Sequence, residues 1–413
     1  MNRYFKLGLL TLLSFNQACT FGGGSAGFNS PPPLQVVIAE GQAVITNGSL
    51  LLAKKQALQD AIRQASLQAG VKVRSQTVVN QNVVQADNFS LRAAAAVSYT
   101  QILDERVTAG IVTVRVKVTL SNDDTCAPAF RKRMMATAFP LVEPSQVSSA
   151  ETQDLYSGIP REINNILMES KDFISRDATH VTLYDNPTLA PELSSDDPYK
   201  TSRVMQLAST QGVQLVLSGV IRDMQIESGD YVKGSGPFAM AKSWMHDVWS
   251  RRGIAVDVYV HDGFSGALLF QSRYKEIVAG DVWIPATYTV GSERFNATTS
   301  GEKIAGIIAQ ASADIRRSLS CYPFATRIIN VEGNMLVIDA GAQENLHAGD
   351  QLVVYADAGD ELSLDGGTRY IARDKRPVGM LTINDSKARY ATGVLDVVPS
   401  KARVKVGDWV RSW

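Results

Sequence analysis

The stretch from residue 204 to residue 276 constrains the fold of this chain more than any other part. Its opening residues repeat apolar side chains at helical spacing, and Gly212 predicts the end of that helix, because glycine adopts the left-handed capping conformation without strain. Residues 213–221 form an almost continuous apolar run, which is typical of a strand buried on both faces. Residues 254–261 alternate in the manner of a half-buried strand, and residues 262–266 predict a turn into a returning strand. This stretch therefore predicts a helix, a central strand and a long hairpin.

Length and charge limit the classes of protein to consider. The chain has 413 residues, which is too long for a single hydrophobic core, so we expect several domains. Its hydrophobic content of 45% is ordinary and allows each domain a core of its own. Lysine and arginine balance aspartate and glutamate at 41 each, and without the first 18 residues the balance becomes slightly acidic. Because phosphate binding needs a basic surplus or stripe, nucleic acid is excluded as the main partner.

The first 18 residues have the organisation of a signal segment. Arg3 and Lys6 form a basic start, and residues 7–15 form a short leucine-rich core. That core is shorter than the roughly 20 apolar residues that span a bilayer, so we expect an exported protein. Residues 19–33, which are rich in glycine, serine and proline, predict a flexible linker.

The three cysteines allow two modifications that occur in exported proteins, lipidation and a disulfide. Cys19 lies where bacterial lipoproteins carry an acylated cysteine, although Asn16 departs from the usual aliphatic residue. Either Cys19 is lipidated, or ordinary signal cleavage removes it. For Cys126 and Cys321, an oxidising periplasm favours a disulfide between them, and the alternative is two buried free thiols.

The rest of the chain begins with a predicted αβ domain, residues 34–130. Alternation in its last strand predicts a sheet with one solvated face, because the valines and the charged residues there cannot share the core side. The predicted elements are a strand pair or bent strand around Gly41 (36–45), a helix (50–68) and strands at 71–84, 97–103 and 110–120.

Residues 131–322 form a second predicted αβ domain. Pro160 predicts a helix start, because a proline in the first turn has no hydrogen bond to lose. An apolar stripe predicts a long helix over residues 299–319. Residues 323–413 read as all-β and contain a Gly-Asp turn twice, at 349–350 and 407–408. The predicted fold class is α+β, with two αβ domains followed by a small barrel-like or sandwich β domain.

Two places are candidate interfaces. Trp244 and Trp249 lie in an unusually apolar loop between the predicted strands of the second domain. Such a loop either packs on the sheet or serves a partner, since tryptophan is a common anchor at interfaces. Arg131 opens a short basic cluster, which is either a solvated junction or a contact for an acidic partner.

Residue patterns for chemistry are weak. The four histidines are scattered without the spacing of a zinc site, and no phosphate-binding loop is present in the sequence. A nucleophile-elbow pattern at residues 23–27 lacks the strand and helix that such a motif needs. We therefore predict no catalytic residue, no metal site and no cofactor, and the sequence disfavours an enzyme.

The order of the parts resembles the flagellar assembly protein T (FlgT) family. The residues that carry the resemblance are the helix AKKQALQDAIRQA (53–65), Cys126, the hairpin VDVYVHDGFSGALLFQSRYKE (256–276), Cys321 and the start of the last domain, GNMLVIDAGAQENLHAGDQLVVY (333–355). Together they span nearly all of the chain after the linker.

The resemblance implies three domains, the middle one similar to the amino-terminal domain of TolB. It also implies a periplasmic role in a ring of the flagellar basal body, the H ring, where the protein self-associates and helps to recruit the stator-associated proteins MotX and MotY. Cys19 and the linker depart from what the family implies.

The sequence is compatible with two functions. One is a non-enzymatic structural and assembly component of the flagellar ring. The other is an outer-membrane lipoprotein that regulates or assembles another envelope machine, which lipidation of Cys19 would favour.

Overall fold

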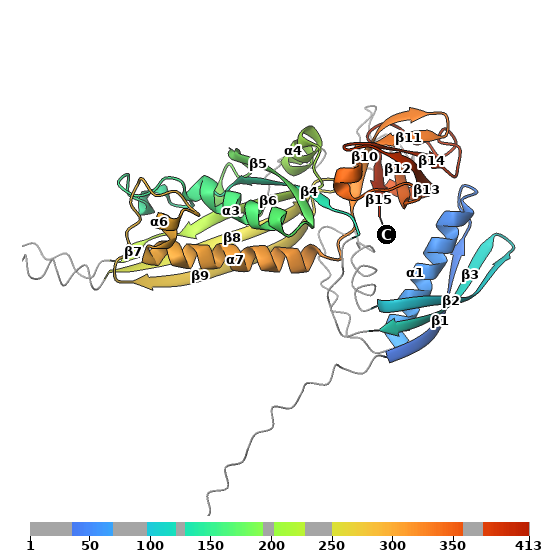
Figure 1. Cartoon of the computed structure of the whole chain (residues 1–413), viewed down its shortest axis with the longest axis horizontal. Helices are drawn as coiled ribbons and strands as arrows, with labels where there is room; N and C mark the ends of the chain where they lie inside the picture. The colour runs from blue at the N-terminus through green and yellow to red at the C-terminus, as the bar shows by residue number, and fades with distance from the viewer. Residues whose placement is uncertain are drawn as a thin grey trace, which may run out of the picture. The chain divides into compact units, whose positions relative to one another are not determined.

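The computed structural model describes residues 35–68, 97–120, 129–192, 202–227, 250–357 and 375–412. These residues belong to one compact unit, Leu34–Trp413, and form two sheets packed with helices and a closed β-barrel (Figure 1). The predicted α+β class with a small β domain is therefore confirmed, and the β domain is a barrel rather than a sandwich.

The amino-terminal αβ part is a three-stranded antiparallel sheet with one helix. Its elements are β1 (Gln35–Val44), α1 (Leu50–Gln68), β2 (Val97–Thr108) and β3 (Ile111–Leu120), with strand order β1-β3-β2. The alternate valines of β3 are buried under the alanines of α1, whereas Arg115 and Lys117 on the other face are exposed. The solvated face is thus confirmed, and the strand predicted at 71–84 lies outside the described residues.

Gly41 has a different role from the predicted bend. β1 runs through it in unbroken register with β3. A Cβ atom at Gly41 would lie 2.2 Å from the carbonyl oxygen of Ala57 and 2.2 Å from the amide nitrogen of Ala61. Glycine is needed because α1 crosses β1 in direct backbone contact. Of the two expected alternatives, the strand pair was wrong, because residues 35–44 form a single strand.

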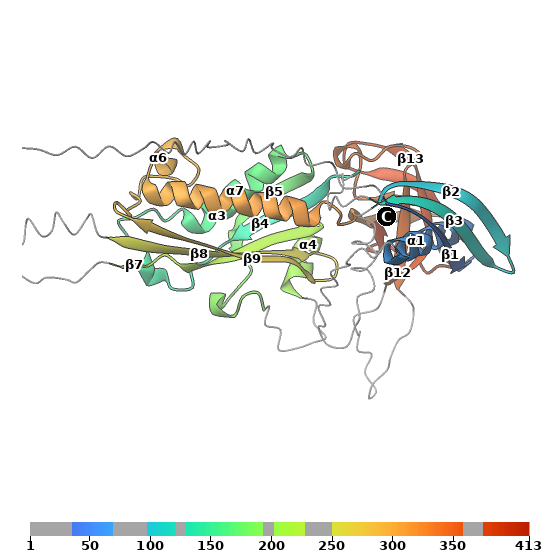
Figure 2. The same ribbon diagram turned by 90° about the horizontal axis from the view of Figure 1, so that it is seen from below.

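The middle part is a six-stranded mixed sheet covered on both faces. Its elements are β4 (Lys132–Ala138), η1 (Pro144–Gln146), α3 (Leu155–Glu169), β5 (Phe173–Thr182), η2 (Pro187–Leu189), α4 (Arg203–Gln211), β6 (Leu215–Asp223), β7 (Ile226–Glu227), β8 (Arg251–Asp262), β9 (Leu268–Ala279), α6 (Glu293–Asn296) and α7 (Thr299–Leu319). The strand order is β5-β4-β6-β8-β7, with β9 on the other side of β8. Helices α3 and α7 pack on one face and α4 on the other (Figures 1 and 2).

The predicted strands and helix of this part are present, with two corrections. Gly212 caps α4 in the left-handed conformation, and β8 and β9 form the predicted hairpin. Pro160 does not begin a helix but lies inside α3, where the carbonyl of Tyr156 that it leaves free accepts the amide of Phe139 instead. Strand β8 is buried on both faces rather than half-buried, because its polar side chains find partners inside the protein.

The carboxyl-terminal part is a closed six-stranded barrel. Its elements are β10 (Ala325–Glu332), β11 (Met335–Ile338), η3 (Ala342–Glu344), β12 (Gln351–Asp357), β13 (Lys375–Ser386), β14 (Ala391–Leu395) and β15 (Trp409–Arg411), in the order β10-β11-β14-β13-β12-β15. The repeated Gly-Asp turn has the same structure twice. Asp350 accepts the amide of His347 at 2.7 Å, and Asp408 accepts that of Lys405 at 2.9 Å. Each aspartate closes the turn that begins a strand.

Candidate functional site

The structure describes the two segments that flank the predicted tryptophan loop, and we call these segments its stem. Trp244 and Trp249 lie outside the described residues. The chain enters and leaves that region through a short antiparallel pair, in which Glu227 faces Arg251 and Ile226 faces Arg252. The next amide, that of Gly253, donates to the carbonyl of Gln225 at 3.1 Å. The stem is therefore a regular extension of the middle sheet.

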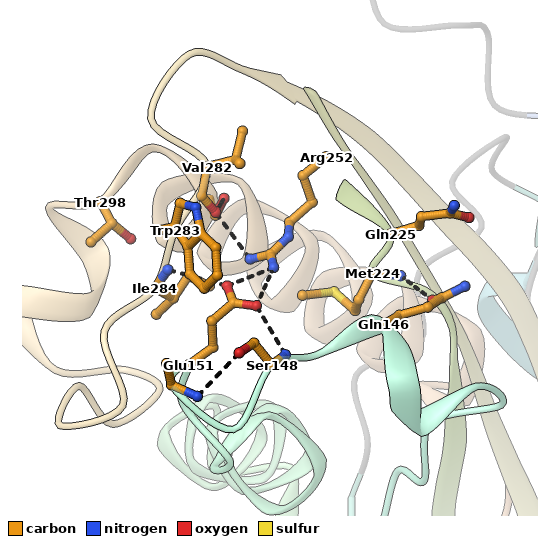
Figure 3. A network of polar contacts seen from close by, with 12 residues as sticks. Gln146, Ser148, Glu151, Met224, Gln225, Arg252, Val282, Trp283, Ile284 and Thr298 are labelled. Carbon is orange, nitrogen blue, oxygen red and sulfur yellow. Dashed lines mark hydrogen bonds and ion pairs between the residues drawn. The ribbon is translucent and has the colours of Figure 1, made fainter. Parts of the chain in front are cut away.

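A buried ion pair lies directly beneath this stem (Figure 3). Nη2 of Arg252 is 2.6 Å and 2.7 Å from the two carboxylate oxygens of Glu151, and both side chains are almost completely buried. Nη1 of Arg252 donates to the carbonyl of Val282 at 2.9 Å. Charge-assisted bonds at such distances hold three separate segments of the chain together.

Glu151 also accepts bonds from the backbone on both sides of it. Its two oxygens receive the amides of Ser148 at 3.3 Å and Ile284 at 3.4 Å. Its own neighbour, Thr152, donates its amide to the carbonyl of Ile284 at 3.1 Å. Because removing one member of a buried pair leaves an uncompensated charge, this network fixes the local backbone strongly.

The network presents Trp283 to the solvent. Val282 and Ile284, on either side of it, are completely buried and are tied to Arg252 and Glu151, whereas Trp283 is 48% exposed. Figure 3 labels Trp283 between Val282 and Ile284, whose backbone groups bond to the buried pair. A large aromatic side chain on so constrained a backbone loses little entropy on binding, as the central residues of interfaces do. The sequence analysis did not single out Trp283. The available signal was a tryptophan in the segment between the hairpin and the helix at 299–319.

The middle sheet holds a second charged cluster, around Asp257. Arg273 donates to both of its oxygens, and Nε of Arg222 donates to one of them at 2.7 Å. Burial by itself raises the pKa of Asp257, but the hydrogen bonds from Arg273 and Arg222 outweigh it and hold the pKa below its usual value. Arg222 also donates to three backbone carbonyls, so its guanidinium serves the fold.

The described histidines have no common site. His261 is buried beside Ser218, with Nδ1 3.4 Å from its hydroxyl oxygen, and burial lowers the pKa of His261 to about 4. His180 and His347 are exposed, and His246 lies outside the described residues. Within those residues, no group of histidine, cysteine, aspartate and glutamate side chains is arranged as a metal site.

Arg131 lies at a junction, but the basic cluster that it opens is not solvated. Arg131 donates to the carbonyls of Gln343 and Phe173. Lys132 is almost completely buried, and this burial lowers its pKa to about 8 although Asp172 opposes the shift. Arg133 is also buried and bonds Nε to Glu344 at 2.8 Å. Arg131 and Arg133 therefore link β4 of the middle sheet to η3 of the carboxyl-terminal part. That Arg131 contacts an external partner stays a prediction.

The cysteine predictions are only partly reached by the described residues. Cys321 is disulfide-bonded. Cys126 and Cys19 lie outside the described residues, so the pairing of Cys126 with Cys321 and the lipidation of Cys19 stay predictions. In the part of the chain that is described, no helix is long and apolar enough to cross a membrane.

These features define the class of the protein: a modular α+β chain whose buried charges mainly hold its own segments in place. Sequence comparison then identifies the family. The middle domain of flagellar assembly protein T matches residues 124–290, and its N-terminal domain matches residues 35–122. The chain therefore belongs to the FlgT family, which assigns it to flagellar assembly.

Comparisons with other proteins are less specific. No curated protein sequence matches significantly. Among solved structures, a hypothetical protein from Chlamydia trachomatis shares 13% identity over 46% of this chain and 98% of its own, with a TM-score of 0.30. The PelC dodecamer from Paraburkholderia phytofirmans shares 13% identity over 48% and 94%, with a TM-score of 0.25. A lipoprotein from Neisseria meningitidis shares 12% over 44% and 97%, with a TM-score of 0.24.

Proposed function

We propose that this chain is a non-enzymatic structural component of the periplasmic H ring of the flagellar basal body. The observation that carries the proposal is the match to two consecutive FlgT domains, which together extend from residue 35 to residue 290. The buried charged clusters agree with a structural role, because Glu151, Arg252 and Asp257 form their hydrogen bonds with other groups of the same chain.

Within this proposal, the ring is held by self-association and helps to recruit MotX and MotY. The contact residues that we propose are Trp244 and Trp249 in the loop, Arg131 at the junction and Trp283 beside the loop stem. Trp283 is supported by its exposure and by the buried network that fixes its backbone.

The direct test is purification of basal bodies from cells that produce the tagged chain. The proposal predicts that the chain co-purifies with the basal bodies in a fixed ratio to other ring proteins. A chain found only in the soluble periplasmic fraction, or in membranes of cells without flagella, would contradict it.

Membrane attachment is a separate part of the proposal. If Cys19 carries lipid, the linker 19–33 tethers the ring component to the outer membrane. Mass spectrometry of the mature amino terminus distinguishes an acylated Cys19 from a cleaved one. A lipidated chain that is absent from basal bodies would favour the alternative, an outer-membrane lipoprotein that assembles or regulates another envelope machine.

We also propose that Cys321 pairs with Cys126, close to the ends of the first two predicted domains. Peptide mapping without reduction should recover both cysteines in one linked peptide. Recovery of Cys126 as a free thiol would remove this pairing.

A further inference from the structure

Among the described residues, strand β1 is an edge of the amino-terminal sheet. Within them it pairs with β3 alone, and its ten residues stay in register from Gln35 to Val44. The opposite edge strand, β2, contains two register shifts. Irregularities of that kind protect an edge, whereas a regular edge presents a row of backbone donors and acceptors that another strand can use.

The backbone groups that face outward can be identified from one hydrogen bond. The amide of Gln42 donates to Asp60 of α1 at 3.2 Å instead of to β3. Because backbone orientation alternates along a strand, the amides and carbonyls of Val36, Ile38 and Glu40 point the same way. Asp60 covers this edge at Gln42, and none of the described residues pairs with the three positions before it.

The side chains along this edge are unusually apolar for a surface. Val36 is 51% exposed and Ile38 is 49% exposed. Of the 21 exposed large apolar side chains in the described part of the chain, nine lie in this small αβ part. Lysine and proline, which commonly protect edge strands, do not occur in β1.

We propose that β1 pairs with β1 of a second copy of this chain, antiparallel about a twofold axis at Ile38. Antiparallel pairing of two identical strands is self-complementary, as a twofold contact requires. In this register Ile38 faces the partner's Ile38, and Val36 faces the partner's Glu40. The three facing pairs supply about six backbone hydrogen bonds.

Charge selects this register over its neighbours. Centring the axis on Glu40 would place two glutamates directly opposite each other, which destabilises a sheet. Centring it further along β1 would displace Asp60 from the amide of Gln42. Around Ile38 no like charges face each other across the new seam, and Glu40 keeps Arg115 as its neighbour on β3.

The helices leave room for this arrangement. Helix α1 packs on both β1 and β3 and meets the backbone of β1 at Gly41, three residues from the proposed axis. With a rise of about 3.4 Å per residue, the two copies of α1 would approach the seam at points about 20 Å apart along it. The product is a six-stranded sheet with two helices on one face, a more usual size than three strands.

The inference does not rest on the proposed ring function. A twofold contact closes on itself, so it yields a dimer and not a ring. If the flagellar proposal holds, the dimer is a unit from which a ring is built through a different surface.

The test compares two lysine substitutions in the full mature chain by sedimentation analysis over a concentration series. Ile38→Lys places two positive charges at the axis and should weaken self-association about tenfold or more. Val44→Lys is the matched control, since Val44 is on the same strand and face, is 64% exposed and lies beyond the paired residues. It should associate as the natural chain does, and circular dichroism should show that both variants fold.

Three results would overturn the proposal. They are a natural chain that is monomeric throughout the series, an Ile38→Lys variant that associates unchanged, and equal effects of the two substitutions. A second test uses Ile38→Cys, because facing Cα atoms about 5.5 Å apart at the axis are within disulfide reach. Oxidation should give a covalent dimer with Ile38→Cys and not with Val44→Cys, and the reverse would contradict the register.

Discussion

Glu151 and Arg252 show how single side chains hold the middle sheet together. Each is nearly inaccessible to water, and together they join the loop stem, the segment before α3 and the segment that carries Trp283. The pair is 101 positions apart in sequence. No local pattern marks either residue, so their partnership could not be predicted from the sequence.

Arg252→Ala should therefore destabilise the protein by about 3–5 kcal/mol, because it leaves the carboxylate of Glu151 buried without its countercharge. Urea denaturation of the full mature chain measures the change. Arg317→Ala is the control, since Arg317, which pairs with Asp314, is exposed and the loss there should stay below about 1 kcal/mol. Equal effects of the two substitutions would contradict the assigned role of the network.

His261 predicts a pH dependence of stability. Burial lowers its pKa to about 4 in the folded protein, from 6.5 in the unfolded chain. Between those values the unfolded chain binds a proton that the folded protein does not, so stability falls as the pH falls from about 6.5 to about 4, by about 3 kcal/mol in total.

His261→Asn removes the imidazole that binds this proton. The free energy of unfolding should then depend less on pH between about 6.5 and about 4. The exposed His180 supplies the matched histidine, and His180→Asn should leave the free energy of unfolding almost unchanged because this side chain is not buried. A natural protein whose stability is constant from pH 6.5 to pH 4.5 would show that His261 does not carry this penalty.

Helices and strands with a regular apolar stripe were predicted well. Helix α1 was expected at residues 50–68 and α7 at 299–319, and both have those bounds. Their periodic cores and clear ends are local properties of the sequence. The errors at Pro160, at Gly41 and in β8 have a common cause, because each depends on a distant segment that supplies a hydrogen bond or a close contact.

Gly41 gives a test of that explanation. Gly41→Ala should destabilise the protein by about 1–3 kcal/mol, because the added methyl group meets the backbone of α1. Gly306→Ala in α7 is the matched change, since no atom lies within 4 Å of the new methyl group there. It should be neutral or should stabilise by up to about 1 kcal/mol. Thermal denaturation of both variants measures these changes. A Gly41→Ala variant as stable as the natural protein would show that the contact with α1 does not constrain this position.

At the level of the complete protein, the order of parts was recognisable while the contacts for assembly were not. Family membership and the fold class followed from motifs distributed along the chain. The residues that meet partners depend on surfaces formed in three dimensions, and Trp283 illustrates the difference. Its exposure results from the burial of Val282 and Ile284 by the network beneath it.

Substitution of the proposed anchors should separate folding from assembly. The double variant Trp244→Ala/Trp249→Ala, and separately Trp283→Ala, should retain the circular dichroism spectrum of the natural chain but reach basal bodies in smaller amounts. Tyr390→Ala is a control for Trp283, because Tyr390 is a similarly exposed aromatic residue of the barrel. Undiminished incorporation of folded variants would exclude these tryptophans as contacts.

The most direct test of the flagellar proposal is electron microscopy of basal bodies from a strain that lacks this gene. The account predicts motors without the outer periplasmic ring density, cells that do not swim, and restoration of both by the natural chain. Complete rings and normal swimming in the deletion strain would contradict it.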